Sequence, residues 1–275
     1  MSIQSTGLRT AGKTKLLLAA VVAAGAALAL SSTSAKADTI IYQDTFPGSS
    51  TSTLVGTKPG PTTNTNAWAV TADATSSGDT FNADGSVTNS TTTTANYGDY
   101  LTFTPTSGNV YTLSATLNPL NTTGTGAWVG IAFDNGIVAD ATKLAPSMLA
   151  HYESSTATGA YARVQAFTTG NTKVYDSNTS TTINPLPLDE TAEMVLNTTS
   201  TDWVVSFYYN NALLSTYTYA TNPTGVDGVS ISANGNSFSS SVADFTLTET
   251  PEPAAFGFFG LGAVGLLLGG RRKRA

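Results

Sequence analysis

Residues 202–217 read DWVVSFYYNNALLSTY, and this stretch decides the fold class. Two runs of apolar and aromatic residues flank the pair Asn210-Asn211, and such runs are typical of β-strands. Asparagine tolerates the positive φ that a two-residue hairpin turn requires. The stretch therefore predicts an antiparallel hairpin with strands at 203–209 and 213–219.

Eight further segments carry the same kind of pattern, mostly with polar and apolar residues in alternation. Gly, Asn, Asp and Pro separate them, as in the Asp-Asn-Gly sequence at 134–136. Many short strands with turn residues between them, in a body of about 210 residues, favour one all-β domain built as a β-sandwich. The predicted strands lie at 39–43, 100–104, 110–117, 128–133, 160–167, 192–197, 228–232 and 242–248.

The hairpin and both ends of this body resemble a known group of β-sandwiches. Residues 202–217 are similar to the late hairpin of concanavalin A-like and laminin-G-like jelly rolls, whose pattern is W-x-V-x-x-Y-x-N-G-x-L. The strand VADFTL at 242–247, the opening DTF at 44–46 and the spacing from Leu54 to Trp68 resemble the same group. The resemblance implies a jelly-roll β-sandwich, although a sandwich of another type would give the same strand pattern.

The N-terminal segment has the three parts of a secretory signal peptide. Its positively charged n-region contains Arg9, Lys13 and Lys15. An apolar stretch at 16–30 follows as the signal helix, and Ala35 and Ala37 fit the small-x-small cleavage pattern. We expect residues 1–37 to be removed and the mature chain to begin at Asp38. The alternative is an uncleaved N-terminal anchor, for which the apolar stretch is short.

The C-terminal segment combines a helix breaker, an apolar stretch and a cationic end. Residues 254–270 contain no charged side chain and would reach about 25 Å as a single transmembrane helix, the short end of what crosses a bilayer. A cationic end is expected on the cytoplasmic side, which leaves 38–250 outside the cytoplasm. The alternative is a buried C-terminal core helix. The breaker is Pro251-Glu252-Pro253, and the cations are Arg271, Arg272, Lys273 and Arg274.

A signal peptide combined with this tail resembles the sorting signal of bacterial PEP-CTERM proteins. The resemblance covers 251–275 and implies processing by an exosortase, an inner-membrane intermediate, and delivery to the surface or extracellular matrix of a Gram-negative bacterium. Proteins of this group are often associated with exopolysaccharide and biofilm matrix. The expected organisation is a signal peptide (1–37), a β-sandwich ectodomain (38–250) and a sorting tail (251–275).

Without the two targeting segments, the charge of the body changes. The chain has 12 Lys and Arg against 18 Asp and Glu, but only 4 of the cations and 17 of the acids fall within 38–250, which gives −13. Such a surface repels phosphate backbones, so we exclude nucleic acid as a partner. Divalent cations or neutral glycans suit it better. The four cations are Lys58, Lys143, Arg163 and Lys173.

The body shows no constellation of catalytic residues. The chain has no cysteine, which excludes disulfides, thiolate nucleophiles and cysteine-ligated zinc. The paired-carboxylate strand of hydrolytic jelly rolls is missing. The densest acids are Asp189, Glu190 and Glu193, of which Glu190 and Glu193 are expected on opposite faces of a strand, as solvated acids. His151 is the only histidine and no Gly-x-Ser-x-Gly sequence surrounds a serine, so we expect His151 at the surface of a strand edge.

Calcium is the one metal that this body suits, because oxygens of Asp, Asn and the backbone ligate it. Asp44 and Asp244 lie in the first and last predicted strands, which pair in many jelly rolls; Asp134, Asn135 and Asp227 are further candidates. None of them has the spacing of a ligand loop. We therefore predict no cofactor and leave a calcium site open.

The three tryptophans either stack on sugar rings or pack in the core. Trp128 and Trp203 occupy alternating strand positions and are expected in the core. Trp68 lies in a region rich in Thr and Asn and is expected to be the freest of the three. One exposed aromatic side chain does not make a glycan-binding platform.

Two functional hypotheses follow. The first is a non-enzymatic protein of the cell surface or extracellular matrix, delivered by its tail and binding glycan weakly. The second is a divergent glycan hydrolase or lyase of the concanavalin A-like type.

Overall fold

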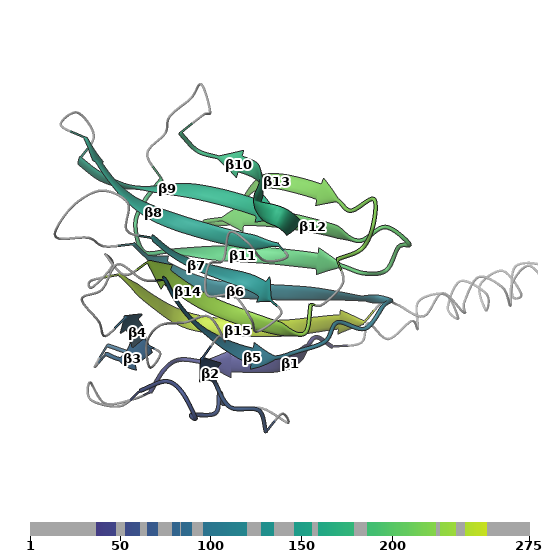
Figure 1. Ribbon diagram of the computed structural model, residues 1–275, viewed down its shortest axis with the longest axis horizontal. Coiled ribbons are helices and arrows are strands. Elements are labelled where there is room, and N and C mark those ends of the chain that lie inside the picture. Colours follow the sequence, from purple (N-terminus) through teal and green to yellow (C-terminus); the bar gives the residue numbers. More distant parts are fainter. Residues whose placement is uncertain are drawn as a thin grey trace, which may run out of the picture. The chain divides into compact units, whose positions relative to one another are not determined.

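Fifteen strands and one 3-10 turn make up the regular structure of the described residues (Figure 1). The computed structural model describes residues 37–47, 53–60, 65–70, 79–82, 84–89, 96–119, 128–134, 146–155, 159–178, 186–223, 226–234 and 240–251. The strands are β1 (Thr39–Asp44), β2 (Ala69–Val70), β3 (Asp79–Phe81), β4 (Ser86–Asn89), β5 (Asn96–Thr102), β6 (Asn109–Asn118), β7 (Trp128–Asp134), β8 (Ser147–Ser155), β9 (Gly159–Thr168), β10 (Thr172–Asp176), β11 (Glu190–Asn197), β12 (Val204–Tyr209), β13 (Ala212–Thr218), β14 (Gly228–Asn234) and β15 (Ser241–Pro251), and the turn is η2 (Thr169–Asn171).

The strands form two antiparallel sheets. One has eight strands in the order β13-β12-β11-β6-β15-β4-β3, with β1 also paired to β15; the other has seven in the order β10-β9-β8-β7-β14-β5-β2. Buried hydrophobic side chains from both sheets form one cluster, so the sheets pack face to face around a shared core. The all-β sandwich is confirmed. Its assignment to the concanavalin A-like jelly rolls stays a prediction.

All ten predicted strands are present, with ends that shift by a few residues. The other five, β2, β3, β4, β8 and β10, are not predicted from the sequence. β2, β3 and β4 have two to four residues each, which is too short for a periodic pattern. β8 has nine residues, but Met148, Leu149 and Ala150 are all buried. A strand buried on both faces shows no alternation.

The hairpin quoted first is confirmed. β12 and β13 pair antiparallel with Tyr209 opposite Ala212, and Asn210 and Asn211 have φ of 48° and 61°. Positive φ at both central residues is the signature of a type I′ turn, whose twist matches that of the two strands.

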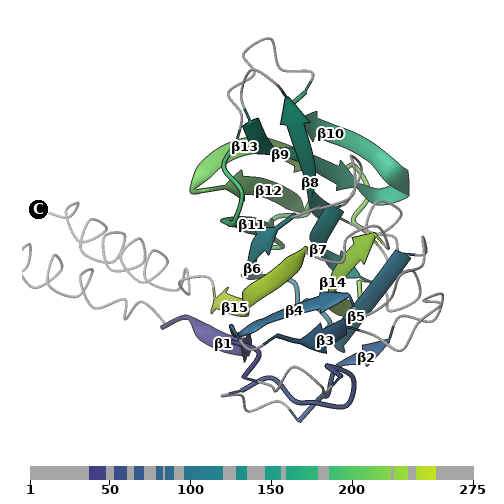
Figure 2. The same cartoon turned by 90° about the vertical axis from the view of Figure 1, so that its left-hand side faces the viewer.

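The first and last strands pair, as expected for Asp44 and Asp244. Figure 2 shows β1 beside β15, with Thr39 opposite Glu249. The hydroxyl of Thr250 donates a hydrogen bond to Asp38 Oδ1 at 2.7 Å. The two ends of the sandwich therefore lie on neighbouring strands.

Trp68 is buried, so the prediction that it is the freest tryptophan is wrong. It is 1% exposed, and its Nε1 donates to Asp44 Oδ2 at 2.8 Å. Its ring contacts Phe46 and Phe245, with centroids 6.2 and 5.0 Å away. Its backbone N–H donates to the carbonyl oxygen of Thr57, which folds this polar segment back onto the core.

The two targeting segments lie almost wholly outside the described residues. Only Ala37 of the predicted signal peptide and Pro251 of the predicted tail are described. Within the described ranges, no helix has the length and apolar character that crossing a membrane requires. The apolar stretches at 16–30 and 254–270 fall outside those ranges, and the sorting signal stays a prediction.

Candidate functional site

The outer side of the seven-stranded sheet carries a group of polar side chains that we call the polar face. Ala150 on β8 and Val164 on β9 belong to the core between the sheets, so the residues next to them along each strand point to the other side. The same alternation on β14 places Ile231 in the core. The polar face consists of Ser147, His151, Gln165, Ser230 and Ser232.

Strand register arranges these residues in neighbouring rows. Ser147 on β8 is opposite Ala132 on β7, which is opposite Ser230 on β14. Residues directly opposite each other have their side chains on the same side of a sheet, and with strands roughly 4.8 Å apart Ser147 and Ser230 are separated by about 10 Å. The next row consists of Gln165, Leu149, Gly130 and Ser232.

Four polar atoms on this face are buried without a hydrogen-bond partner. They are four of seven such atoms in the described residues: Ser147 Oγ, His151 Nε2, Ser230 Oγ and Ser232 Oγ. The three serines are 0, 1 and 3% exposed. A buried polar group without a partner costs about 1–3 kcal/mol, and native proteins satisfy most such groups. Four on one face therefore mark a place where ordered water or a ligand completes the hydrogen bonding.

Three apolar side chains share this side of the sheet. Trp128, Leu149 and Phe167 form a buried cluster separate from the main core. Leu149 lies across Gly130, and a Cβ atom on that glycine would clash with Leu149 Cδ2. The outer side of this sheet therefore combines buried apolar side chains with hydroxyl, amide and imidazole groups.

His151 lies in the middle of the sheet, so the prediction of a strand-edge surface position is wrong. Its strand pairs on both sides, with Trp128 and Arg163 directly opposite it. Burial and, after it, the positive charge of Arg163 lower the pKa of His151 to about 4, against a hydrogen bond with Gln165 that raises it. The imidazole is therefore neutral at neutral pH, with one ring nitrogen as donor and the other as acceptor.

A charged cluster lies beside the polar face, at the β9–β10 edge. Asp176 accepts hydrogen bonds from Arg163 Nε at 2.9 Å and Nη2 at 2.6 Å. Gln165 Nε2 donates to the same carboxylate at 2.8 Å and Lys173 Nζ at 2.7 Å. Burial alone would raise the pKa of Asp176, but these hydrogen bonds, with one from the Asn178 backbone, outweigh it and hold the pKa well below its usual range.

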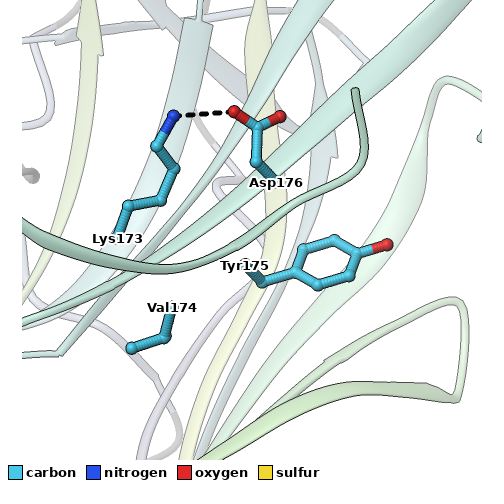
Figure 3. A pocket seen from close by; sticks show the side chains of 4 residues that line it. All are labelled: Lys173, Val174, Tyr175 and Asp176. Carbon is cyan, nitrogen blue, oxygen red and sulfur yellow. Dashed lines mark hydrogen bonds and ion pairs between the residues drawn. The ribbon is translucent and has the colours of Figure 1, made fainter. Parts of the chain in front are cut away.

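A hollow opens at this edge of the sheet. It has a volume of about 230 Å³ and is lined by Lys173, Val174, Tyr175 and Asp176 of β10. Figure 3 shows Lys173 and Asp176 facing each other, with the ring of Tyr175 directed elsewhere.

The carboxylates near the polar face are engaged by one arginine. Arg163 pairs with Asp176, and its Nη1 lies 3.8 Å from Glu153 Oε1. A glycosidase needs a carboxylic acid of raised pKa beside a second carboxylate, whereas the pKa of Asp176 is lowered. Among the described residues, the polar face offers neutral donors and acceptors and not this catalytic pair.

A second hollow, of about 260 Å³, contains the calcium candidate Asp244. Asp189 and Asn118 also line it, and Asn118 Oδ1 is buried without a partner. Asp44 points away from this hollow into the core, where burial raises the pKa of its carboxyl. The part of the chain that is described contains no group of three or more His, Asp or Glu side chains able to hold a metal. Asp44 and Asp244 thus lie on paired strands, Asp44 buried and Asp244 in the hollow.

The other predicted acids lie apart from one another. Glu190 and Glu193 are on β11, where alternate residues are buried, and their odd spacing places them on opposite faces as predicted. Asp227 is exposed. Asp134 ends β7, and Asn135 lies outside the described residues.

Two tryptophans are predicted in the core. Trp203 is partly buried and packs against the main core. Trp128 is buried as expected, but in the cluster on the polar face. The alternation on β7 predicts burial correctly without showing that both sides of that strand are covered.

Comparisons with solved structures give distant similarities. The carbohydrate recognition domain of Emp46p in its potassium-bound form has 8% identity over 66% of this chain and 87% of that one, with a TM-score of 0.41. An endo-1,3-β-glucanase from Streptomyces sioyaensis has 13% identity over 78% and 98%, with a TM-score of 0.45. Lectin UEA-II, complexed with galactose, has 10% identity over 66% and 92%, with a TM-score of 0.35. Similarity at this level does not indicate a shared function.

No known protein family matches the sequence, and no curated protein matches it either.

Proposed function

We propose that this chain is an exported, non-enzymatic protein of the cell surface or extracellular matrix whose polar face binds a saccharide. The observation that carries the binding proposal is the group of four buried, unpartnered polar atoms on that face. Saccharide hydroxyls both donate and accept hydrogen bonds, so they complement serine hydroxyls and a neutral imidazole.

Charge supports a saccharide over other polymers. The body carries −13, which opposes nucleic acid and anionic lipid but has little effect on a neutral glycan. A matrix rich in exopolysaccharide is also the destination that the tail resemblance implies.

Binding is tested with the full chain in detergent, by affinity electrophoresis through gels that each contain one polysaccharide. Ser230→Ala removes one unpartnered hydroxyl and should weaken binding about two- to tenfold, the effect of one hydrogen bond. Ser86→Ala is the matched control, because Ser86 is also buried but its Oγ donates to Asp84 and accepts from Asn82. Equal retardation of wild type and Ser230→Ala on every polysaccharide would refute a role for this face.

Delivery by the tail is tested separately. Deleting 251–275 should move the protein away from the cell envelope, because that segment holds the predicted helix and sorting motif. Unchanged fractionation would remove the sorting proposal and leave the binding proposal intact.

We propose that the protein is not catalytic because Arg163 lies against both carboxylates beside the polar face, Asp176 and Glu153, and the pKa of Asp176 is lowered. Incubation with the same polysaccharides should release neither reducing ends nor unsaturated sugars. Activity that disappears on Glu190→Gln or Glu193→Gln would favour the hydrolase or lyase hypothesis instead.

A further inference from the structure

We propose that the charged cluster at the β9–β10 edge binds the carboxylate of an acidic saccharide, with Lys173 and Arg163 as the recognising residues. This inference rests on the proposed function, because it names the class of saccharide that the polar face takes. It adds a charged subsite to a face whose other groups are neutral.

Asp176 holds the two cationic side chains of this subsite in place but does not engage all of their hydrogen-bond donors. Lys173 has three N–H donors and gives one to Asp176; its side chain is 41% exposed. Arg163 gives Nε and Nη2 to the same carboxylate and keeps its Nη1 donors on the side of Glu153. Asp176 thus fixes two cationic side chains next to each other, which lowers the entropy that an incoming anion must overcome.

Local charge distinguishes this place from the rest of the body. Two of the four cations in 38–250 meet here beside the carboxylates of Asp176 and Glu153, so these four groups are neutral together in a body that carries −13. Glu153 offsets part of the charge of Arg163, so Lys173, the more exposed of the two, supplies most of the attraction. A carboxylate that is repelled by the acidic surface elsewhere is attracted here, and charge-assisted hydrogen bonds are the stronger kind.

The hollow is lined by β10, and β10 pairs with β9, which carries Gln165 of the polar face. Lys173 is opposite Phe167, and Arg163 is opposite His151. The hollow, about 230 Å³, is smaller than a site for a whole drug-sized ligand, roughly 300–1,000 Å³. It therefore suits one acidic sugar unit, whose neighbours in the polymer would extend over the polar face.

The test compares a uronic acid oligosaccharide with its carboxyl-reduced form, which keeps every other atom of the chain. Isothermal titration of the full chain should give tighter binding of the acidic form. Lys173→Gln should weaken binding of the acidic form about three- to tenfold and leave the reduced form unchanged. Lys173→Arg should retain the preference. Lys58→Gln, which removes an exposed cation elsewhere, is the control and should change neither affinity.

The outcomes separate this inference from the proposed function. Equal binding of the two forms, or equal effects of Lys173→Gln and Lys58→Gln, would overturn the carboxylate subsite and leave saccharide binding standing. Binding of neither form, nor of any polysaccharide in the gels, would overturn both. A circular dichroism spectrum matching wild type shows that Lys173→Gln is folded.

Discussion

Replacing Ser230 by alanine should make the protein more stable while it weakens ligand binding. Ser230 is 1% exposed and its Oγ has no hydrogen-bond partner. The folded state therefore carries the desolvation cost of that hydroxyl, about 1–3 kcal/mol. Alanine removes this cost and loses only the packing of one oxygen atom, so we expect a net gain of about 1 kcal/mol. For a domain of this size the melting temperature should rise by about 2–4 °C.

The same substitution at Ser86 should have the opposite sign. The Oγ of Ser86 lies 2.7 Å from Asp84 Oδ1 and 2.9 Å from Asn82 Nδ2. Ser86→Ala leaves both partners without it and should cost about 1 kcal/mol, a fall of about 2–4 °C. Calorimetry and urea unfolding measure both variants, and an unchanged m-value shows that the unfolded state is unaffected.

A fall in melting temperature for Ser230→Ala, similar to that for Ser86→Ala, would refute the reasoning. It would mean that an ordered water satisfies Ser230 in the folded protein. A rise with unchanged saccharide affinity would mean that the unpartnered hydroxyl is a defect of packing and not part of a site. Only a rise in stability together with a loss of affinity fits a group kept for binding at a cost in stability.

Three further predictions concern single positions. The imidazole C–H signals of His151 should not titrate by NMR between about pH 7.5 and 5, because the pKa of His151 is about 4. Since this folded-state pKa is lowered, the stability of the protein should decline as pH falls from about 6.5 towards 4. His151→Gln should remove that decline. Gly130→Ala should lower stability by about 1–3 kcal/mol, because its Cβ would meet the backbone carbonyl oxygen of Met148 at 2.6 Å as well as the side chain of Leu149. Gly60→Ala, which meets no atom within 4 Å, should not lower it, and urea unfolding measures both. Asn211→Ala should cost about 1 kcal/mol because φ is 61° there, and Asn211→Gly should preserve or raise the melting temperature.

Alternation made much of the fold predictable. β6 is the best case, because its burial pattern switches at every residue from Val110 to Asn118, and this is the pattern that one core face and one outer face produce. The Asn210-Asn211 turn was predictable for a separate reason, the tolerance of asparagine for positive φ. Both signals are local, so they need no knowledge of which strands become neighbours.

The burial of Trp68 and the position of His151 were not predictable in this way. Trp68 is buried because a hydrogen bond to Asp44, 24 residues away, satisfies its indole nitrogen, and no local pattern contains that contact. His151 lies within the sheet and not at its edge because two other strands flank β8. Both depend on sheet topology, which one sequence does not reveal.

The polar face was not predictable either, because it too depends on sheet topology. Its composition nevertheless suggests a sequence signal for such faces. A sheet face that meets solvent carries charged or large polar residues, and a face in the core carries large apolar ones. The outward residues of β14, Ser230 and Ser232, are neither: they are small, polar and buried. On β8 the outward residues Ser147 and Leu149 are buried as well. A segment that lacks alternating polarity can lie between two strands that show it clearly. When small polar residues stand at its outward positions, it therefore indicates a sheet face that is covered or occupied. Because those residues leave hydrogen bonds unmade, they mark a covered face where ordered water or a ligand completes the hydrogen bonding.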